Sequence, residues 1–336
     1  MGAESTPRQK VKAILRGEAP PTPLLIPLLF ALGTRLENLL FQNFKTNPTK
    51  ISDALRQIRS VLKVDGVTCY YDPFLEAEAL GCRCDRREDG SCILTPPSFT
   101  ITAELRDRLK SSDVLSREGA VPVACEVIRR VKSMLRDEPA LMVRVTGPLT
   151  LAQQLVGESN LEDARLPGRE LIKFAAETTA SVCKSFVEAG SDLVLLTEDA
   201  VPALNAEASQ WYCSLLAPIN NAIRFYEALP VLLLSRISDA TLAVLLDEGP
   251  ECLLCPPLSS DVFACAPGGH STRLMGVNVP AEAFASASHH LHAAMTSLGD
   301  LRERPCLITS ATDIAIGTDM KTLTANLSAI RGYLGK

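Results

Sequence analysis

The chain has 336 residues, of which 46% are hydrophobic and 22% are charged, and its formal net charge is −5. This composition is typical of a folded globular protein, and an acidic balance without a basic stripe argues against a nucleic-acid partner. No apolar run approaches the roughly 20 residues of a membrane helix and the N-terminus shows no secretory pattern, so we expect no membrane contact. The eleven cysteines are spread over a long chain, mostly within apolar runs, which predicts a reducing, cytoplasmic location.

Short apolar segments alternate with helical segments along the chain, which is the pattern of a parallel α/β fold. Eight strands are predicted, at Leu24–Phe30, Gly66–Tyr71, Leu141–Val145, Asp192–Leu196, Val231–Leu234, Cys252–Cys255, Arg273–Val277 and Pro305–Thr309. Helices are predicted between them, at Pro48–Val64, Ala124–Arg136, Arg169–Ala189, Leu215–Ala228 and Ala281–Leu298. Eight such units indicate a (β/α)8 TIM barrel, built as a single domain over residues 1–336.

One stretch interrupts this alternation. Residues Cys82–Thr102 contain Glu88-Asp89-Gly90-Ser91 between two arms of apolar or alternating character. An Asp-Gly pair at such a position is a strong turn signal, so a β-hairpin insertion is expected there.

Carboxylates follow several of the predicted strands at their C-terminal ends, where the loops of a barrel carry the chemistry. They are Asp72, Glu198, Asp199, Asp239 and Asp313. Carboxylates that cluster raise one another's pKa, so one of them would stay protonated near neutral pH and act as a general acid, or bind an amine when ionised. Helix capping or a local ion pair is an equally good explanation of any single one.

Five segments together resemble a known family. Asp72 is followed by Glu78-Ala79-Leu80-Gly81, and the other four segments are Lys12–Glu18, Val145–Ala152, Gly190–Asp199 and Ser310–Thr318. In this order and spacing they resemble the uroporphyrinogen decarboxylase superfamily, which includes decarboxylases and corrinoid-dependent methyltransferases. The phrase EAEALGC at residues 76–82 is closer to the methyltransferase branch, of the methylcobamide:coenzyme M methyltransferase type. The resemblance implies the same barrel, with a comparable insertion, and a corrinoid (cobalamin) presented by a partner protein.

The residues that carry chemistry in either branch are largely replaced. The zinc ligands of the thiol-alkylating methyltransferases fall on Ser235, Ile237 and Thr312, so we expect no zinc at these positions. The decarboxylase tyrosine falls on Gln154, its serine on Asp199 and its histidine on Thr312, and Arg35 is the one arginine near the first strand. This loss of basic groups disfavours a polycarboxylate substrate.

Two other groups of candidate metal ligands have simpler explanations. Cys252 and Cys255, with Cys265 and His270 downstream, have loose zinc-like spacing, but residues three apart on a strand point to opposite faces. The sequence His289-His290-x-His292 does not place its histidines on one helical face as an i, i+4 pair would. Neither group is expected to bind metal.

The sequence therefore predicts a corrinoid-dependent methyltransferase that moves a methyl group between a small O- or N-methylated substrate and a corrinoid protein, without the usual zinc. Asp72 and Asp199 are the expected catalytic residues. The expected substrate-binding residues are Tyr70, Gln154, Glu198, Ser235, Arg236, Thr312 and Asp313. The alternatives are a decarboxylase of porphyrin biosynthesis, or a non-catalytic binding relative. On this hypothesis, Asp72→Asn lowers turnover and leaves folding intact.

Overall fold

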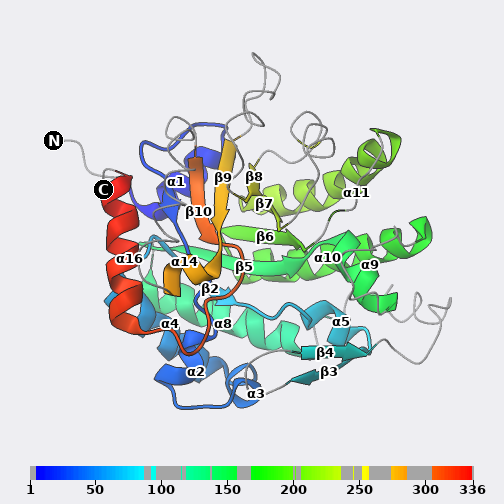
Figure 1. Cartoon of the computed structure of the whole chain (residues 1–336). Coiled ribbons are helices and arrows are strands. Elements are labelled where there is room, and N and C mark those ends of the chain that lie inside the picture. The colour runs from blue at the N-terminus through cyan, green and yellow to red at the C-terminus, as the bar shows by residue number, and fades with distance from the viewer. Residues whose placement is uncertain are drawn as a thin grey trace.

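The computed structural model describes residues 5–86, 92–95, 115, 119–136, 138–156, 168–199, 201, 206–235, 245, 252–256, 274–285 and 305–334. Within this part of the chain, eight parallel strands form one sheet in the order β1-β10-β9-β8-β7-β6-β5-β2 (Figure 1). The strands are β1 (Leu24–Leu25), β2 (Gly66–Tyr70), β5 (Ala140–Thr146), β6 (Leu193–Glu198), β7 (Leu229–Leu234), β8 (Cys252–Cys255), β9 (Leu274–Val279) and β10 (Pro305–Ser310). This order is that of a (β/α)8 barrel, as predicted.

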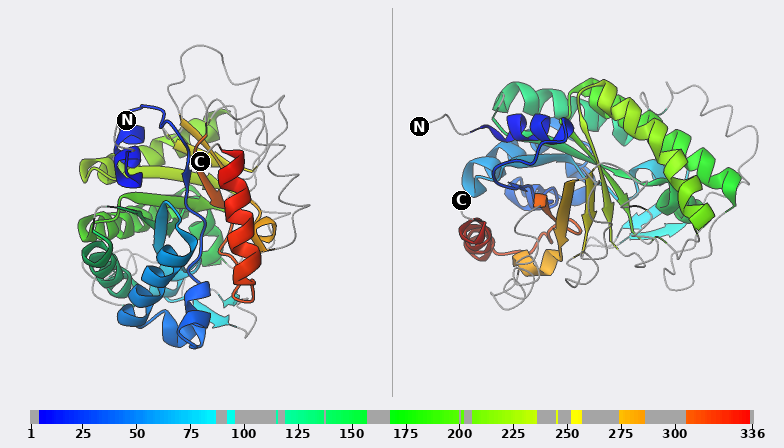
Figure 2. Two further views of the ribbon diagram at one scale, coloured as in Figure 1. Left: turned by 90° about the vertical axis from the view of Figure 1, so that its left-hand side faces the viewer. Right: turned by 90° about the horizontal axis from the view of Figure 1, so that it is seen from above.

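Helices cover the outer face of this barrel, as the two views of Figure 2 show. The larger ones are α1 (Pro7–Leu15), α4 (Pro48–Leu62), α8 (Ala120–Leu135), α9 (Pro148–Val156), α10 (Arg169–Ala189), α11 (Ala206–Phe225) and α16 (Met320–Tyr333). The short ones are α2 (Leu32–Leu36), α3 (Phe41–Phe44), α5 (Leu75–Ala79) and α14 (Ala281–Ala285). None of the helices in the described ranges is both long enough and apolar enough to cross a membrane.

The sheet closes between its two end strands through Asp65. The Asp65 main-chain N–H donates to the carbonyl of Leu25 at 3.1 Å, and its carboxylate accepts from the Leu25 N–H at 2.8 Å. Gly66 begins β2 at this seam, where an added Cβ would lie 2.6 Å from the Ala140 carbonyl oxygen and 2.8 Å from Ile26 Cδ1. Glycine at this position allows β2 to lie this close to the backbone of β5 and to the side chain of Ile26, which follows β1.

The two ends of the barrel differ in character. The interior near the strand N-termini is apolar, with Leu195, Val231 and Leu254 in one buried cluster that also takes in Val11 and Ile14 of α1. Toward the C-terminal ends of the strands, the residues that point into the barrel are polar instead. They are Thr68, Arg144, Thr197, Asn278 and Thr309, all of them buried. Helix α1 thus covers an apolar end, and the chemistry gathers at the other.

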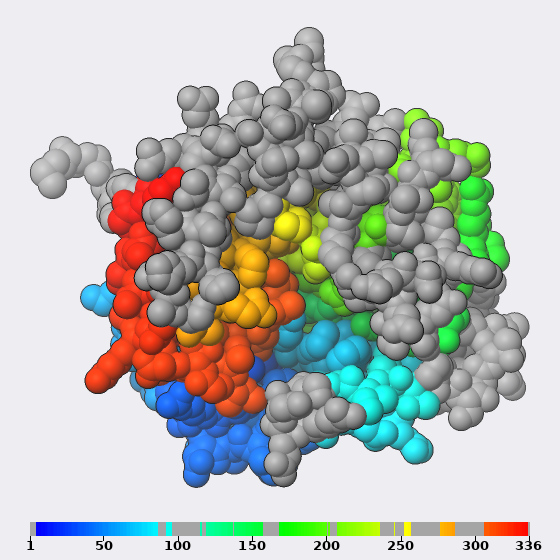
Figure 3. Space-filling model, viewed as in Figure 1, coloured from blue at the N-terminus to red at the C-terminus, as the bar shows by residue number. Residues whose placement is uncertain are grey.

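The predicted insertion is a hairpin of two antiparallel strands, β3 (Arg83–Arg86) and β4 (Cys92–Thr95). In the space-filling view of Figure 3, the hairpin (cyan) lies on the same face as the segment that follows β10 (orange-red). Cys84 and Cys92 form a disulfide across it, which the sequence had not suggested. The eight other cysteines that the structure describes are free and buried.

Most element boundaries agree with the prediction, and the differences have local causes. Strand β1 pairs only at Leu24–Leu25 rather than to Phe30, because Pro27 has no N–H to donate to a ladder. Helix α11 begins earlier than Leu215 and contains Pro218. The predicted helix Ala281–Leu298 is described only as α14, and its remainder lies outside the described residues.

Candidate active site

At the C-terminal end of the barrel, Tyr71 interacts with three charged side chains, and we call the four residues the mouth cluster: Tyr71 after β2, Arg144 on β5, Asp199 after β6 and Asp313 after β10. The guanidinium carbon of Arg144, on β5, lies 5.7 Å from the centre of the Tyr71 ring. The pKa of Tyr71 is raised to about 12, chiefly by burial; the charge of Arg144 opposes the rise, and the charges of Asp313 and Asp199 contribute to it. Tyr71 therefore lies within electrostatic reach of all three charged groups.

Asp313 is the member of the cluster best suited to proton transfer. Its Oδ2 accepts from the Ala31 N–H at 2.7 Å, whereas its Oδ1 is buried and has no partner among the described residues. Burial raises the pKa of Asp313 to about 7, against the opposing effect of hydrogen bonds from the amides of Ala31, Phe30 and Ile314. A carboxyl group with this pKa is partly protonated at neutral pH, which is what a general acid requires.

Arg144 is a buried positive charge beside Tyr71. The residue is only 3% exposed, and its Nη1 donates to Thr146 Oγ1 at 2.7 Å and to the Asp72 carbonyl at 3.3 Å. Thr146 in turn donates to the Glu76 carboxylate from its hydroxyl at 2.5 Å and from its N–H at 3.0 Å. Burial raises the pKa of Glu76, and the charge of Arg144 opposes that rise.

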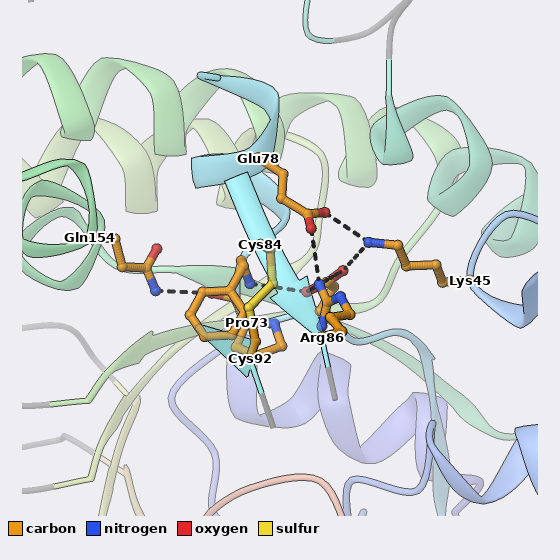
Figure 4. Close-up of a disulfide and its surroundings, with 9 residues drawn as sticks. Lys45, Pro73, Glu78, Cys84, Arg86, Cys92 and Gln154 are labelled. Carbon is orange, nitrogen blue, oxygen red and sulfur yellow. Dashed lines mark hydrogen bonds and ion pairs between the residues drawn. A yellow bond between two sulfur atoms is a disulfide. The ribbon is translucent and has the colours of Figure 1, made fainter. Parts of the chain in front are cut away.

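Asp72 lies outside the mouth cluster, in an ion-pair cluster with Lys45, Glu78 and Arg86. Its side chain is fully buried, with Lys45 Nζ at 3.1 Å from Oδ2 and Arg86 Nη2 at 2.6 Å from both oxygens. The same two cations contact Glu78 at 2.8 and 3.4 Å, as the dashed lines of Figure 4 show. Because Arg86 belongs to β3, this cluster also ties the hairpin to the loop after β2.

Glu198, at the end of β6, is bound by the start of α9. Its carboxylate accepts from the N–H groups of Leu149 and Thr150 at 3.1 and 2.7 Å, from Thr150 Oγ1 at 2.7 Å and from the Tyr212 hydroxyl at 2.5 Å. Burial raises the pKa of Glu198, and these hydrogen bonds oppose the rise. A Cβ on Gly147 would lie 2.3 Å from the Glu198 carboxyl carbon, which explains the glycine before Pro148. Glu198 therefore caps a helix.

The remaining predicted site residues lie in several places. Tyr70 is buried and donates its hydroxyl to the Lys45 carbonyl at 2.9 Å, and Gln154 Nε2 donates to the Pro73 carbonyl at 3.1 Å. Ser235 is partly buried, with its N–H bonded to the Glu198 carbonyl at 3.0 Å, and Thr312 is exposed. Arg236 and Asp239 lie outside the described residues.

Of the four predicted mouth carboxylates that the structure describes, it brings Asp199 and Asp313 together, whereas Asp72 and Glu198 lie in other clusters. The other two residues of the mouth cluster, Tyr71 and Arg144, were not among the predicted site residues. The sequence did hold a signal for Arg144. A single arginine within the apolar run Leu141–Val145 needs hydrogen-bond partners for its guanidinium, whether the side chain points into the barrel or toward the helices. Lys45 and Arg86 carried no such signal, because neither lies within an apolar run: Lys45 follows α3, and Arg86 ends a hairpin strand whose neighbouring residues are charged or polar.

Residues 6–234 match the family model described as "Uroporphyrinogen decarboxylase (URO-D)". The chain belongs to the uroporphyrinogen decarboxylase family. The resemblance inferred from Asp72, the EAEALG phrase and the Gly147-Pro148 turn is thereby confirmed. No curated protein matches the chain.

Solved structures extend this likeness over the whole chain at the level of fold. A methyltransferase from Methanosarcina mazei superposes with a TM-score of 0.79 at 16% identity, covering 99% of this chain and 100% of that chain. A B12-independent methionine synthase from Shewanella sp. W3-18-1, in complex with selenomethionine, gives a TM-score of 0.57 at 13% identity, covering 85% of this chain and 87% of that one. At such identities the comparison establishes the barrel architecture.

This member of the uroporphyrinogen decarboxylase family shows no metal-binding group in its described ranges, where no three His, Cys, Asp or Glu side chains are placed to hold an ion. Of the three positions at which the resemblance predicts the loss of a zinc ligand, Ser235 and Thr312 are described by the structure, and Ile237 lies outside the described residues. Cys252 faces Cys306 inside the barrel, with 3.5 Å between the sulfurs, whereas Cys255 packs on the helix side. The two cysteines point to opposite faces, as the spacing predicted. Cys265, His270 and the histidines near 290 lie outside the described residues.

Proposed function

We propose that this member of the uroporphyrinogen decarboxylase family is a methyltransferase that moves a methyl group between a small O- or N-methylated substrate and a corrinoid carried by a partner protein. The observation that carries the proposal is Asp313, a partly buried residue at the barrel mouth whose buried Oδ1 has no partner among the described residues and whose pKa is raised to about 7. Removing a methyl group from an ether or an amine leaves an oxygen or nitrogen that departs more easily once it is protonated. In this proposal Asp313 supplies that proton.

Asp199 and Asp72 have different roles in this proposal. Asp199 follows β6 and is partly buried, and its carboxylate has no hydrogen bond or ion pair within the part of the chain that is described, so it is free to contact a substrate. Asp72, which the sequence proposed as an acid, has both carboxylate oxygens bound by cations in the structure. In this proposal Asp313 therefore takes the general-acid role, and Asp72 holds the loop that carries Tyr71.

The cofactor is proposed from the family resemblance. A bound corrinoid would accept or supply the methyl group. The unpartnered Asp313 Oδ1 fits a reaction in which the protein supplies a proton, and it fits less well the zinc-activated thiol chemistry whose ligands are replaced here. Asp313 needs no contact with the cofactor for this purpose.

The decarboxylase alternative has less support. A porphyrinogen with many carboxylates requires several cations at the mouth, and the described mouth cluster contains one cation, Arg144, with two carboxylates.

A purified sample of the chain, mixed with cob(I)alamin and a panel of methoxy and methylamino compounds, should convert the cobalt absorbance to that of methylcob(III)alamin. Release of CO2 from uroporphyrinogen without methyl transfer would favour the decarboxylase, and no turnover in either assay would favour a non-catalytic relative.

A further inference from the structure

Arg144 offers an unused hydrogen-bonding edge inside the barrel. A guanidinium presents Nε–H and one terminal N–H side by side, in the geometry that matches a carboxylate. In Arg144 the opposite nitrogen, Nη1, is occupied by Thr146 and by the Asp72 carbonyl. Nε is buried and, among the residues that the structure describes, has no partner; the hydrogen bonds that Arg144 makes with these residues all come from Nη1, which leaves Nη2 available beside Nε.

Among the residues that the structure describes, no carboxylate contacts the guanidinium of Arg144 directly. Glu76 reaches it only through the hydroxyl of Thr146. A buried donor without an acceptor is costly, so natural proteins rarely keep one without a function. The contacts of Nη1 fix the guanidinium in place, and the Tyr71 ring lies over it at 5.7 Å. The edge that remains is pre-organised for an acceptor that the described chain does not supply.

We propose that Arg144 is the specificity-determining residue of this site and binds a carboxylate of the substrate through Nε and Nη2. This rests on the proposed function and narrows it, because the substrate is then a small O- or N-methylated carboxylic acid. One arginine with two neighbouring carboxylates suits a single acidic group and disfavours a polyacid. Tyr71 lies next to both Arg144 and Asp313, so an acid held by the arginine can direct its methylated oxygen or nitrogen toward the Asp313 carboxyl.

Matched ligand pairs test this without a corrinoid. Calorimetry on the full chain would compare 4-methoxybenzoate with 4-methoxybenzamide, and N,N-dimethylglycine with its primary amide. We expect at least one acid to bind roughly tenfold or more tightly than its amide, since a charge-assisted bidentate contact is lost in the amide. Arg144→Lys should remove most of this preference, because an ammonium lacks the planar fork.

Two controls keep the result interpretable. Arg331→Lys, in α16, changes an arginine that bonds the Leu62 carbonyl far from the mouth, and it should retain the preference for the acid. Thermal unfolding of Arg144→Lys should show a folded protein, and Arg144→Gln provides a second variant if it does not. Equal affinity for acid and amide in every pair, including no binding of either, would overturn the inference.

The inference and the proposed function fail in different ways. Methyl transfer from acid and amide with the same KM, unchanged in Arg144→Lys, would overturn the inference and leave the methyltransferase intact. A preference for the acid that depends on Arg144, without methyl transfer to cobalamin from any compound in the panel, would support the anion site and contradict the proposed function.

Discussion

Replacing Asp72 by asparagine should destabilise the fold, because the structure encloses this carboxylate between two cations. The Asp72 side chain is 0% exposed, and those of Lys45 and Arg86 are 10% and 7% exposed. Asparagine keeps an oxygen for the Phe74 N–H, which Asp72 Oδ1 accepts at 3.1 Å, but it removes the negative charge. Two nearly buried cations are then left with Glu78 as their remaining carboxylate.

The size of the effect follows from that arrangement. Removing one partner of a buried ion pair typically costs about 3–5 kcal/mol. Glu78 retains contacts with both cations and is 26% exposed, so we expect the lower end, about 3 kcal/mol. For a chain of this length each kcal/mol lowers Tm by about 2 °C, which gives a fall of about 6 °C.

Thermal unfolding followed by circular dichroism measures this directly. Glu207→Gln is the matched control, because it removes an ion pair with Arg169 whose side chains are 80% and 58% exposed, and it should leave Tm unchanged. An Asp72→Asn protein with unchanged Tm and much reduced turnover would refute the reasoning, and would return Asp72 to the catalytic role that the sequence suggested.

Two further predictions concern stability. Burial raises the pKa of Asp313 to about 7 from an ordinary value near 4, so the native state binds the proton more tightly than the unfolded chain and loses stability as pH rises between these values. Asp313→Asn should therefore raise Tm relative to the native protein at about pH 8, and the gain should shrink toward pH 4, whereas a gain independent of pH would contradict the assignment. Gly147→Ala should lower the free energy of unfolding by about 1–3 kcal/mol, because the added Cβ would meet the Glu198 carboxyl. The control, Gly317→Ala, adds a Cβ in open space and should leave stability unchanged. Equal Tm values for the two variants would count against the Glu198 cap.

The barrel was predictable because its signals are local. Short apolar runs at regular intervals identify eight strands, and an Asp-Gly pair identifies the hairpin. The same logic places Asp199 and Asp313 at the barrel mouth, since both follow strands. These features depend on residues that are close in the sequence.

The roles of individual carboxylates were not predictable in this way. Asp72 obtains its partners from Lys45, at the end of α3, and from Arg86, on the hairpin, and no spacing in the sequence reveals that they converge. The position of Glu198 at a strand end predicted a mouth residue, whereas in the structure the start of α9 and the Tyr212 hydroxyl bind its carboxylate. Position at a strand end indicates where a carboxylate lies, but its burial and partners decide what it does.

The pH dependence of methyl transfer in the native protein and in Asp313→Asn tests the central claim most directly. Single-turnover transfer from a methylated substrate to cob(I)alamin, followed by the cobalt absorbance, should slow as pH rises through about 7 in the native protein, because Asp313 then loses its proton. Asp313→Asn should be slower by roughly a hundredfold or more and should lose this pH dependence. Transfer by Asp313→Asn at the native rate, with the same fall above pH 7, would show that another group supplies the proton and would contradict the account.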